Sequence, residues 1–157
     1  MSKHKRIAVG TGISLLLRLP ATDKSIEKVA EAHRRIIAEN GSVWLGIVGK
    51  TYSAKNISHI KENGEFLYLV QNTHDGISVY KGEMSDVNEK LPETQYPFVP
   101  RYYHGQGITD RARIWVKLLS LARVATKEIE GLRVVSSGRK ASVLLSGMAY
   151  LGIVERE

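Results

Sequence analysis

The sequence contains no cysteine. A disulfide framework, thiolate catalysis and cysteine-ligated zinc are therefore excluded. Long apolar runs are also missing: the longest near the N-terminus, residues 13–17, is far too short to span a bilayer. No signal-peptide cleavage site follows it. These absences predict a cytoplasmic protein that does not engage a membrane.

Sequence motifs of catalysis and cofactor binding are equally scarce. The "GTG" at residues 10–12 lacks the third glycine and the following helix of a dinucleotide fingerprint, and GxxxxGK[ST] does not occur. No two of the five histidines fall at metal-ligand spacing, and the HExxH and GxSxG motifs are absent. A catalytic triad is assembled in space, so an enzyme stays open, but nothing promotes one. We therefore expect no enzymatic activity, no metal and no cofactor.

The composition is that of a soluble globular protein, with 43% hydrophobic and 25% charged residues in 157. We expect one domain, residues 1–157. The net charge is +7, and residues 101–140 hold nine basic against three acidic side chains, so nearly all of the excess lies there. A solvated basic face and a nucleic-acid footprint both fit this segment.

Periodicity predicts the elements of the first half. Residues 6–20 resemble a strand or two, interrupted by glycines and closed by Pro20. Residues 21–41 resemble an amphipathic helix capped by Thr22 or Asp23 and stopped at Gly41. The apolar stripe of this helix includes His33, which we expect to be packed inside. Residues 42–50, "SVWLGIVGK", read as a buried strand, and residues 53–64 as a short helix. Residues 65–72 and 77–84 form a hairpin around the turn "THDG".

The second half begins with a long proline-rich and tyrosine-rich loop, residues 88–111, which is functional rather than disordered. A long strand over 112–124, a short helix near 126–132 and terminal strands follow. The order predicts an α+β fold: a small, twisted, partly closed mixed β-barrel flanked by two or three helices. We expect residues 1–41 to be an N-terminal strand and helix extension and residues 42–154 to be the barrel core.

An ordered set of segments resembles the EVE branch of the PUA-like superfamily, which is related to YTH domains. These segments are "SVWLGIVGK", "ISHIKENGEFLYLV", "GISVYKGEMSDV", "ARIWVKLLSLARV" and "LRVVSSGRKASVLLSG". The N-terminal helix with "LLLRLP" is similar to the extension of EVE-type recognition domains in McrB-type, modification-dependent restriction endonucleases. The chain departs from the family in its long loop and in Gly64-Glu65, where Gly-Asp is usual.

The resemblance implies a non-catalytic domain that binds nucleic acid, DNA rather than RNA, and holds one flipped, modified base in an aromatic pocket. It would be the targeting module of a restriction or defence system, and motor and nuclease domains of a longer polypeptide would be its partners. Pocket formation is assigned to Trp44, Tyr52, Ser53, Tyr68, Asn72 and Trp115. Phosphate and backbone binding is assigned to Lys50, Arg101, Tyr102, Tyr103, Arg111, Arg113, Arg139 and Lys140.

Three alternatives remain open at this point. Trp44, Tyr68 and Trp115 also fit an ordinary core. The chain could bind structured RNA as a PUA-like domain. From another class, it could be a small-molecule sensor or small enzyme that uses His74, Asp75 and His104 near a pocket.

Overall fold

The chain forms strands and helices in the computed structural model, which describes residues 12–21, 24–146 and 150–157. The strands are β1 (Ile13–Leu19), β2 (Val43–Val48), β3 (Gly64–Thr73), β4 (Gly76–Asn88), β5 (Ala112–Leu118), β6 (Ala122–Val124), β7 (Leu132–Val134) and β8 (Leu151–Arg156). The helices are α1 (Ile26–Asn40), α2 (Ala54–Asn63), α3 (Tyr102–Gly105), α4 (Ile108–Arg111) and α5 (Lys127–Glu130), with 3₁₀ turns η2 (Glu93–Phe98) and η3 (Ala141–Leu145).

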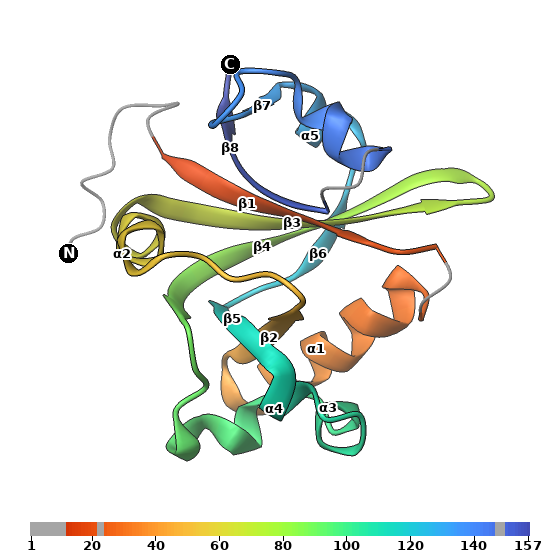
Figure 1. The fold of residues 1–157 in the computed structure, drawn as a ribbon. Helices are drawn as coiled ribbons and strands as arrows, with labels where there is room; N and C mark the ends of the chain where they lie inside the picture. Colours follow the sequence, from red (N-terminus) through yellow and green to blue (C-terminus); the bar gives the residue numbers. More distant parts are fainter. Residues whose placement is uncertain (1–11, 22–23, 147–149) are drawn as a thin grey trace.

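The eight strands form one mixed sheet in the order β2-β5-β4-β3-β1-β8-β7, with β6 paired to β4. Only the β1–β3 pairing is parallel among those of the described strands. In Figure 1, β7, β8 and α5 lie at the top, and α3 and α4 at the bottom. The α+β class is confirmed. The sheet does not close between β2 and β7 within the described residues, so the predicted barrel is not confirmed.

Strand β4 connects the two parts of the sheet. Its first part pairs with β3 and β6, and its last part pairs with β5 from Met84 onwards, with a register shift between Met84 and Asp86. Gly82 lies just before this change of partner. A Cβ at that position would come within 2.5 Å of the Ser120 carbonyl oxygen. Glycine therefore permits the close approach of the β5–β6 connection to β4.

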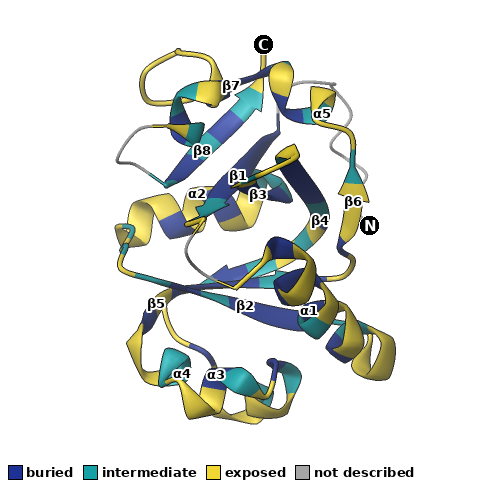
Figure 2. Ribbon diagram, turned by 90° about the vertical axis from the view of Figure 1, so that its right-hand side faces the viewer, coloured by how far each residue is buried: buried dark blue, intermediate teal, exposed yellow. Residues whose placement is uncertain are grey.

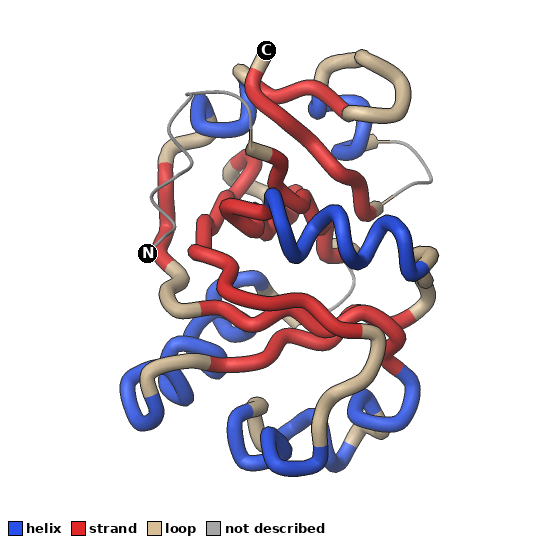
Figure 3. Tube along the Cα trace, turned by 90° about the vertical axis from the view of Figure 1, so that its left-hand side faces the viewer, coloured by secondary structure: helices blue, strands red, loops and turns tan. Residues whose placement is uncertain are grey.

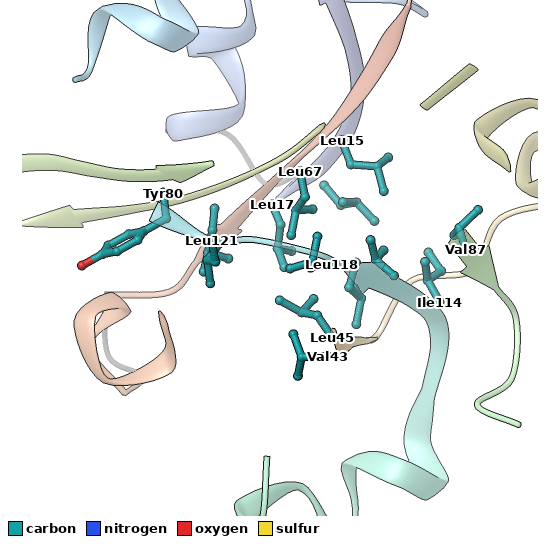
Figure 4. Packing of buried hydrophobic residues seen from close by; sticks show 14 of the residues in the cluster. Leu15, Leu17, Val43, Leu45, Leu67, Tyr80, Val87, Ile114, Leu118 and Leu121 are labelled. Carbon is teal, nitrogen blue, oxygen red and sulfur yellow. The ribbon is translucent and has the colours of Figure 1, made fainter. Parts of the chain in front are cut away.

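The main core fills the space between the strands and helices. It takes Leu15 and Leu17 from β1 and Val43 and Leu45 from β2 (Figure 4). Ile47 of β2 belongs to the same core. Figure 2 shows α1 beside β2, with buried residues along the helix. Helix α2 packs on β4, β1 and β3 from another side, and Figure 3 shows it lying across the strands. A second cluster lies between β3, β7, β8 and η3.

A serine hydroxyl accepts a hydrogen bond from a backbone N–H at the N-terminus of each of the two long helices. The Ser25 hydroxyl accepts a hydrogen bond from the Lys28 N–H at 3.3 Å, so Ser25 is the N-cap of α1. The expected caps of α1, residues 22–23, lie outside the described residues. Gly41 ends α1 with φ of 89°, as predicted. Ser53 caps α2 by accepting from the Asn56 N–H at 3.1 Å.

Three other predictions need correction. Strand β1 is hydrogen bonded between β3 and β8, so it is part of the sheet and not of an extension. The long strand over 112–124 is two strands, because residues 119–121 separate β5, which pairs with the last part of β4, from β6, which pairs with an earlier part. The loop 88–111 contains η2, α3 and α4. The predicted hairpin and the short helix α5 are confirmed.

Candidate functional site

Strand β2 separates two environments, because successive side chains of a strand point to opposite faces. Val43, Leu45 and Ile47 face the main core. Trp44 and Trp115 lie on the other face, where the loop 88–111 covers them. We call this group the aromatic cluster; its buried members are Trp44, Leu91, Val99, Tyr103, Ala112 and Trp115.

Both tryptophans are sealed inside the aromatic cluster, with 2% of Trp44 and 1% of Trp115 exposed. The indole Nε1 of Trp44 donates to the Gln95 side-chain oxygen at 3.0 Å. A Cβ on Gly46 would lie 2.8 Å from the Trp115 ring, so only glycine at this position leaves room for the ring as it is placed. The assignment of Trp44 and Trp115 to a ligand pocket is therefore wrong, because the loop 88–111 packs on them.

A pocket of about 580 Å³ lies elsewhere, beside β2. It opens between the end of β1, β2, α1 and the segment of α3 and α4. We call it the β1–β2 pocket. Its lining residues are Leu17, Arg18, Leu19, Pro20, Lys24, Val29, His33, Leu45, Gly46, Ile47, Val48, Leu69, Tyr102, Tyr103, Gln106, Ile108, Arg111 and Tyr150.

Positive charge borders the β1–β2 pocket. Arg18, Lys24 and Arg111 line it, and no described lining residue is acidic. The Lys24 ammonium lies 4.8 Å from the centre of the Tyr102 ring, a cation–π distance. The Arg111 guanidinium donates to the Gln106 carbonyl oxygen at 3.0 Å. An anionic group of a ligand would therefore be attracted to this pocket.

A buried chain of hydrogen bonds forms one wall of the pocket. His33 Nδ1 lies 2.7 Å from the Val29 carbonyl oxygen, which can only accept, so Nδ1 carries the proton. His33 Nε2 therefore accepts from the Tyr103 hydroxyl at 2.6 Å. The Tyr103 oxygen in turn accepts from the Gly46 N–H at 3.2 Å. Helix α1, helix α3 and β2 thus meet at one phenol.

Both ring groups of this chain are neutral near pH 7. Burial lowers the pKa of His33 to about 4, although the hydrogen bond with Val29 acts in the opposite direction. Burial raises the pKa of Tyr103 well above its usual value, and the neighbouring Tyr102 adds to that effect. Burial also raises the pKa of Tyr102 to about 12. The predicted packing of His33 inside the protein is confirmed.

A second tyrosine fixes the opposite part of the pocket. The Tyr150 hydroxyl donates to the Val48 carbonyl oxygen at 2.9 Å, and the Tyr150 carbonyl accepts from the Arg18 N–H at 2.7 Å. Tyr150 thereby ties β1 to β2 across the pocket. Tyr102 and Tyr150 are both half-buried, so their rings remain in part accessible.

The other predicted base-binding residues have structural roles outside the pocket. Tyr68 is buried in the second cluster, and its hydroxyl accepts from Arg156 at 3.3 Å. Tyr52 packs against the main core, and Ser53 caps α2. Asn72 donates to the Leu145 carbonyl oxygen at 2.9 Å. The structure does not bring these four side chains together, since each makes its contacts in a different part of the fold.

The predicted phosphate-binding residues divide into groups. Tyr102, Tyr103 and Arg111 line the pocket, so the structure brings these three together. Arg101 and Arg113 are exposed near them but do not line it, and the Arg113 guanidinium donates to the Asp110 carbonyl oxygen at 2.9 Å.

The remaining predicted cations, Lys50, Arg139 and Lys140, do not line the pocket. The Lys50 ammonium is 5.7 Å from the Tyr52 ring centre. Arg139 and Lys140 follow β7, at the top of Figure 1, whereas α3 and α4 lie at the bottom. The predicted grouping of Arg139 and Lys140 with Arg111 in phosphate binding is therefore wrong, because the two ends of the basic segment lie at opposite ends of the molecule.

The groups of the alternative enzyme or sensor site also lie apart from the pocket. His74 and Asp75 form the turn of the β3–β4 hairpin, and His104 lies in α3. None of the three lines the β1–β2 pocket. Across the described residues, no cluster of histidine and acidic side chains suits a metal ion. No helix in that part of the chain is long and apolar enough to cross a membrane.

Several pocket residues were not singled out from the sequence: Arg18, Lys24, Gln106, Ile108 and Tyr150. The sequence contains a signal for one of them, Arg18. Arg18 interrupts the apolar strand "LLLRLP", and a cation in such a strand needs an anionic or wet environment. His33 gave a second signal, since a polar ring on the apolar stripe of a helix needs buried partners.

Comparison of the chain with protein-family models, with curated proteins and with solved structures finds no match. The resemblance to EVE domains therefore stays a prediction from the sequence motifs. The β1–β2 pocket is the feature of the structure from which function can be argued.

Proposed function

We propose that this chain is a non-catalytic nucleic-acid recognition domain that holds one flipped, modified base in the β1–β2 pocket. The resemblance to EVE domains favours DNA over RNA, and a targeting role beside motor and nuclease domains in a restriction or defence system. Tyrosines, aliphatic side chains and cations gather around this pocket, and that combination is the observation that carries the proposal.

The size and lining of the pocket suit a flat ring with an attached anion. Its volume of about 580 Å³ lies within the ~300–1,000 Å³ of small-molecule sites. Aliphatic side chains from β1, β2 and β3 provide apolar surface for a ring, and Tyr102 and Tyr150 provide aromatic surface. Arg18, Lys24 and Arg111 supply positive charge for the phosphate that a nucleotide brings with it.

The energetics of base flipping require both kinds of contact. Extrusion of a base costs a few kcal/mol of pairing and stacking. Stacking on an aromatic side chain returns roughly 1–3 kcal/mol. Phosphate contacts and hydrogen bonds to the base edge supply the rest. A pocket that combines tyrosine rings with three cationic side chains meets this requirement without any tryptophan.

The test is fluorescence anisotropy of labelled oligonucleotides that carry a modified or an unmodified base, across a range of salt concentrations. We expect preference for the modified base and a slope of log affinity against log salt that changes by ~0.9 for each phosphate contacted on a duplex. Equal binding of the modified and unmodified oligonucleotides, absent binding or salt-insensitive binding would refute the proposal.

Two arginines offer a matched pair of variants. Arg111 and Arg113 are both exposed, and each guanidinium donates to backbone carbonyl oxygens, but only Arg111 lines the pocket. We expect Arg111→Gln to weaken binding ~10-fold, the cost of one charge-assisted hydrogen bond, and Arg113→Gln to weaken it far less. Equal losses in the two variants would mean that the pocket is not the binding site.

The same assay separates the alternatives. Competition between RNA and DNA of one sequence decides whether the chain acts on structured RNA. A thermal-shift screen of free nucleotides and metals tests the sensor: a large shift with a free nucleotide, with no oligonucleotide binding, would replace the proposed function by a small-molecule function at the same pocket.

A further inference from the structure

Every polar side-chain atom of the hydrogen-bond chain on the pocket wall already has a partner. The Tyr103 hydroxyl uses its one proton for His33 Nε2 and accepts from the Gly46 N–H. His33 uses its other nitrogen for the Val29 carbonyl oxygen. The imidazole and phenol are 0% and 2% exposed. A ligand group that reaches this wall therefore meets polar atoms that are already paired.

The side chains around these two rings are aliphatic. Leu17, Val29, Leu45, Ile47 and Leu69 line the pocket together with His33 and Tyr103. The other polar and charged side chains of the pocket are all exposed or half-buried: Arg18, Lys24, Tyr102, Gln106, Arg111 and Tyr150. The pocket thus has a polar rim and an interior wall that offers an incoming hydroxyl no unpaired side-chain partner.

We propose, on the basis of the function proposed above, that this wall selects a base with an apolar substituent, such as a methyl group, and rejects a hydroxymethyl group at the same ring position. A hydroxyl buried without a hydrogen-bond partner is penalised, whereas a methyl group is not. Tyr103 and His33 are the residues that set this preference. The expected discrimination is ~10- to 100-fold, the range in which an apolar pocket rejects an added hydroxyl.

One substitution should reverse the effect in part. Tyr103→Phe keeps the ring, which packs at 6.0 Å from Trp115 and 5.1 Å from Tyr102 between ring centres. It removes the hydroxyl and leaves His33 Nε2 as a free acceptor and the Gly46 N–H as a free donor. The hydroxyl of a hydroxymethyl group can donate to the first and accept from the second. A merely structural role for Tyr103 predicts weaker binding of both ligands, not a changed preference.

Tyr102→Phe is the matched control. Tyr102 is the adjacent residue and lines the same pocket, but its hydroxyl makes no hydrogen bond within the described residues. The same atom is removed, and the His33 chain stays intact. We expect this variant to keep the preference of the unsubstituted protein for methyl over hydroxymethyl.

The experiment measures anisotropy with three otherwise identical DNA oligonucleotides that carry cytosine, 5-methylcytosine or 5-hydroxymethylcytosine at one position. A second set carries adenine or N6-methyladenine. We expect the unsubstituted protein to prefer a methylated base, and 5-methylcytosine to exceed 5-hydroxymethylcytosine at least ~10-fold. In Tyr103→Phe this ratio should fall to ~3 or less, while circular dichroism checks the fold.

The outcomes are distinct. Equal affinity of the unsubstituted protein for the methyl and hydroxymethyl ligands overturns this inference and leaves the proposed function standing. An unchanged ratio in folded Tyr103→Phe overturns the role of the phenol. If Tyr103→Phe does not fold, the ratio in the unsubstituted protein still decides the selectivity. No binding of any modified oligonucleotide overturns the proposed function, and this inference with it.

Discussion

Acid should destabilise this protein through His33. Its pKa is about 4 in the folded chain, against 6.5 for an unburied histidine, because burial disfavours the imidazolium. The unfolded chain therefore binds a proton between these two values that the folded chain does not bind. The stability due to neutral His33 is fully present above pH 6.5 and is lost progressively as the pH falls towards 4.

The magnitude follows from the size of the shift. A difference of roughly 2.5 pKa units at roughly 1.4 kcal/mol per unit gives ~3 kcal/mol between pH 7 and pH 4. Protonation would also break the chain, because an imidazolium donates from both nitrogens and Tyr103 could no longer donate to Nε2. The cations Arg18, Lys24 and Arg111 line the same pocket and do not favour a charged imidazole.

The assay is urea denaturation, followed by tryptophan fluorescence, at pH 7, 6, 5 and 4. Carboxylates also titrate in this range, so the comparison is with His33→Gln, which cannot titrate and retains an amide for hydrogen bonding. The free energy of unfolding of the unsubstituted protein should fall ~3 kcal/mol more than that of His33→Gln. Parallel pH profiles for the two proteins would refute the assignment of a buried, neutral His33.

Two further predictions concern the aromatic cluster. Gly46→Ala should lower the free energy of unfolding by ~1–3 kcal/mol in the same assay, since the added Cβ would lie 2.8 Å from the buried Trp115 ring and 3.1 Å from the Ala112 Cβ; an unchanged midpoint would show that the ring can move aside. Trp44→Phe should cost ~1–3 kcal/mol, because the Gln95 amide loses its indole partner and volume is lost from a packed site, whereas a loss of ligand affinity without a loss of stability would return Trp44 to the pocket.

The helices and most strands were accessible from the sequence, because each is encoded locally. The apolar stripe of α1, its stop at Gly41 and the turn between β3 and β4 all lie within a few residues of the structure that they specify. The break between β5 and β6 was not accessible. It depends on Gly82 of β4, which lies some distance away in the chain and admits the Ser120 carbonyl oxygen.

The sequence shows which side chains of β2 share a face, but it does not show which of the two faces borders a cavity. Trp44 and Gly46 alternate with Leu45 and Ile47, and both sets are apolar. Which set faces a cavity depends on what covers it. The loop 88–111 supplies Leu91 and Val99 as cover for Trp44, and a proline-rich stretch gives no periodic signal for such packing. An aromatic side chain in a strand is thus weak evidence for a ligand pocket.

The positive charge of the chain was visible in the sequence, but the positions where it is available to a ligand were not. The basic excess of residues 101–140 is real, yet several of its members are engaged by acids from other segments: Arg123 with Glu27 at 3.5 Å, Arg133 with Glu155 at 2.9 Å and Lys140 with Glu157 at 3.8 Å. The cations of the pocket come from β1, from the residue before the cap of α1 and from α4. Ion pairs within the fold therefore reduce the part of this basic segment that can attract a phosphate, and a local count of charges cannot show it.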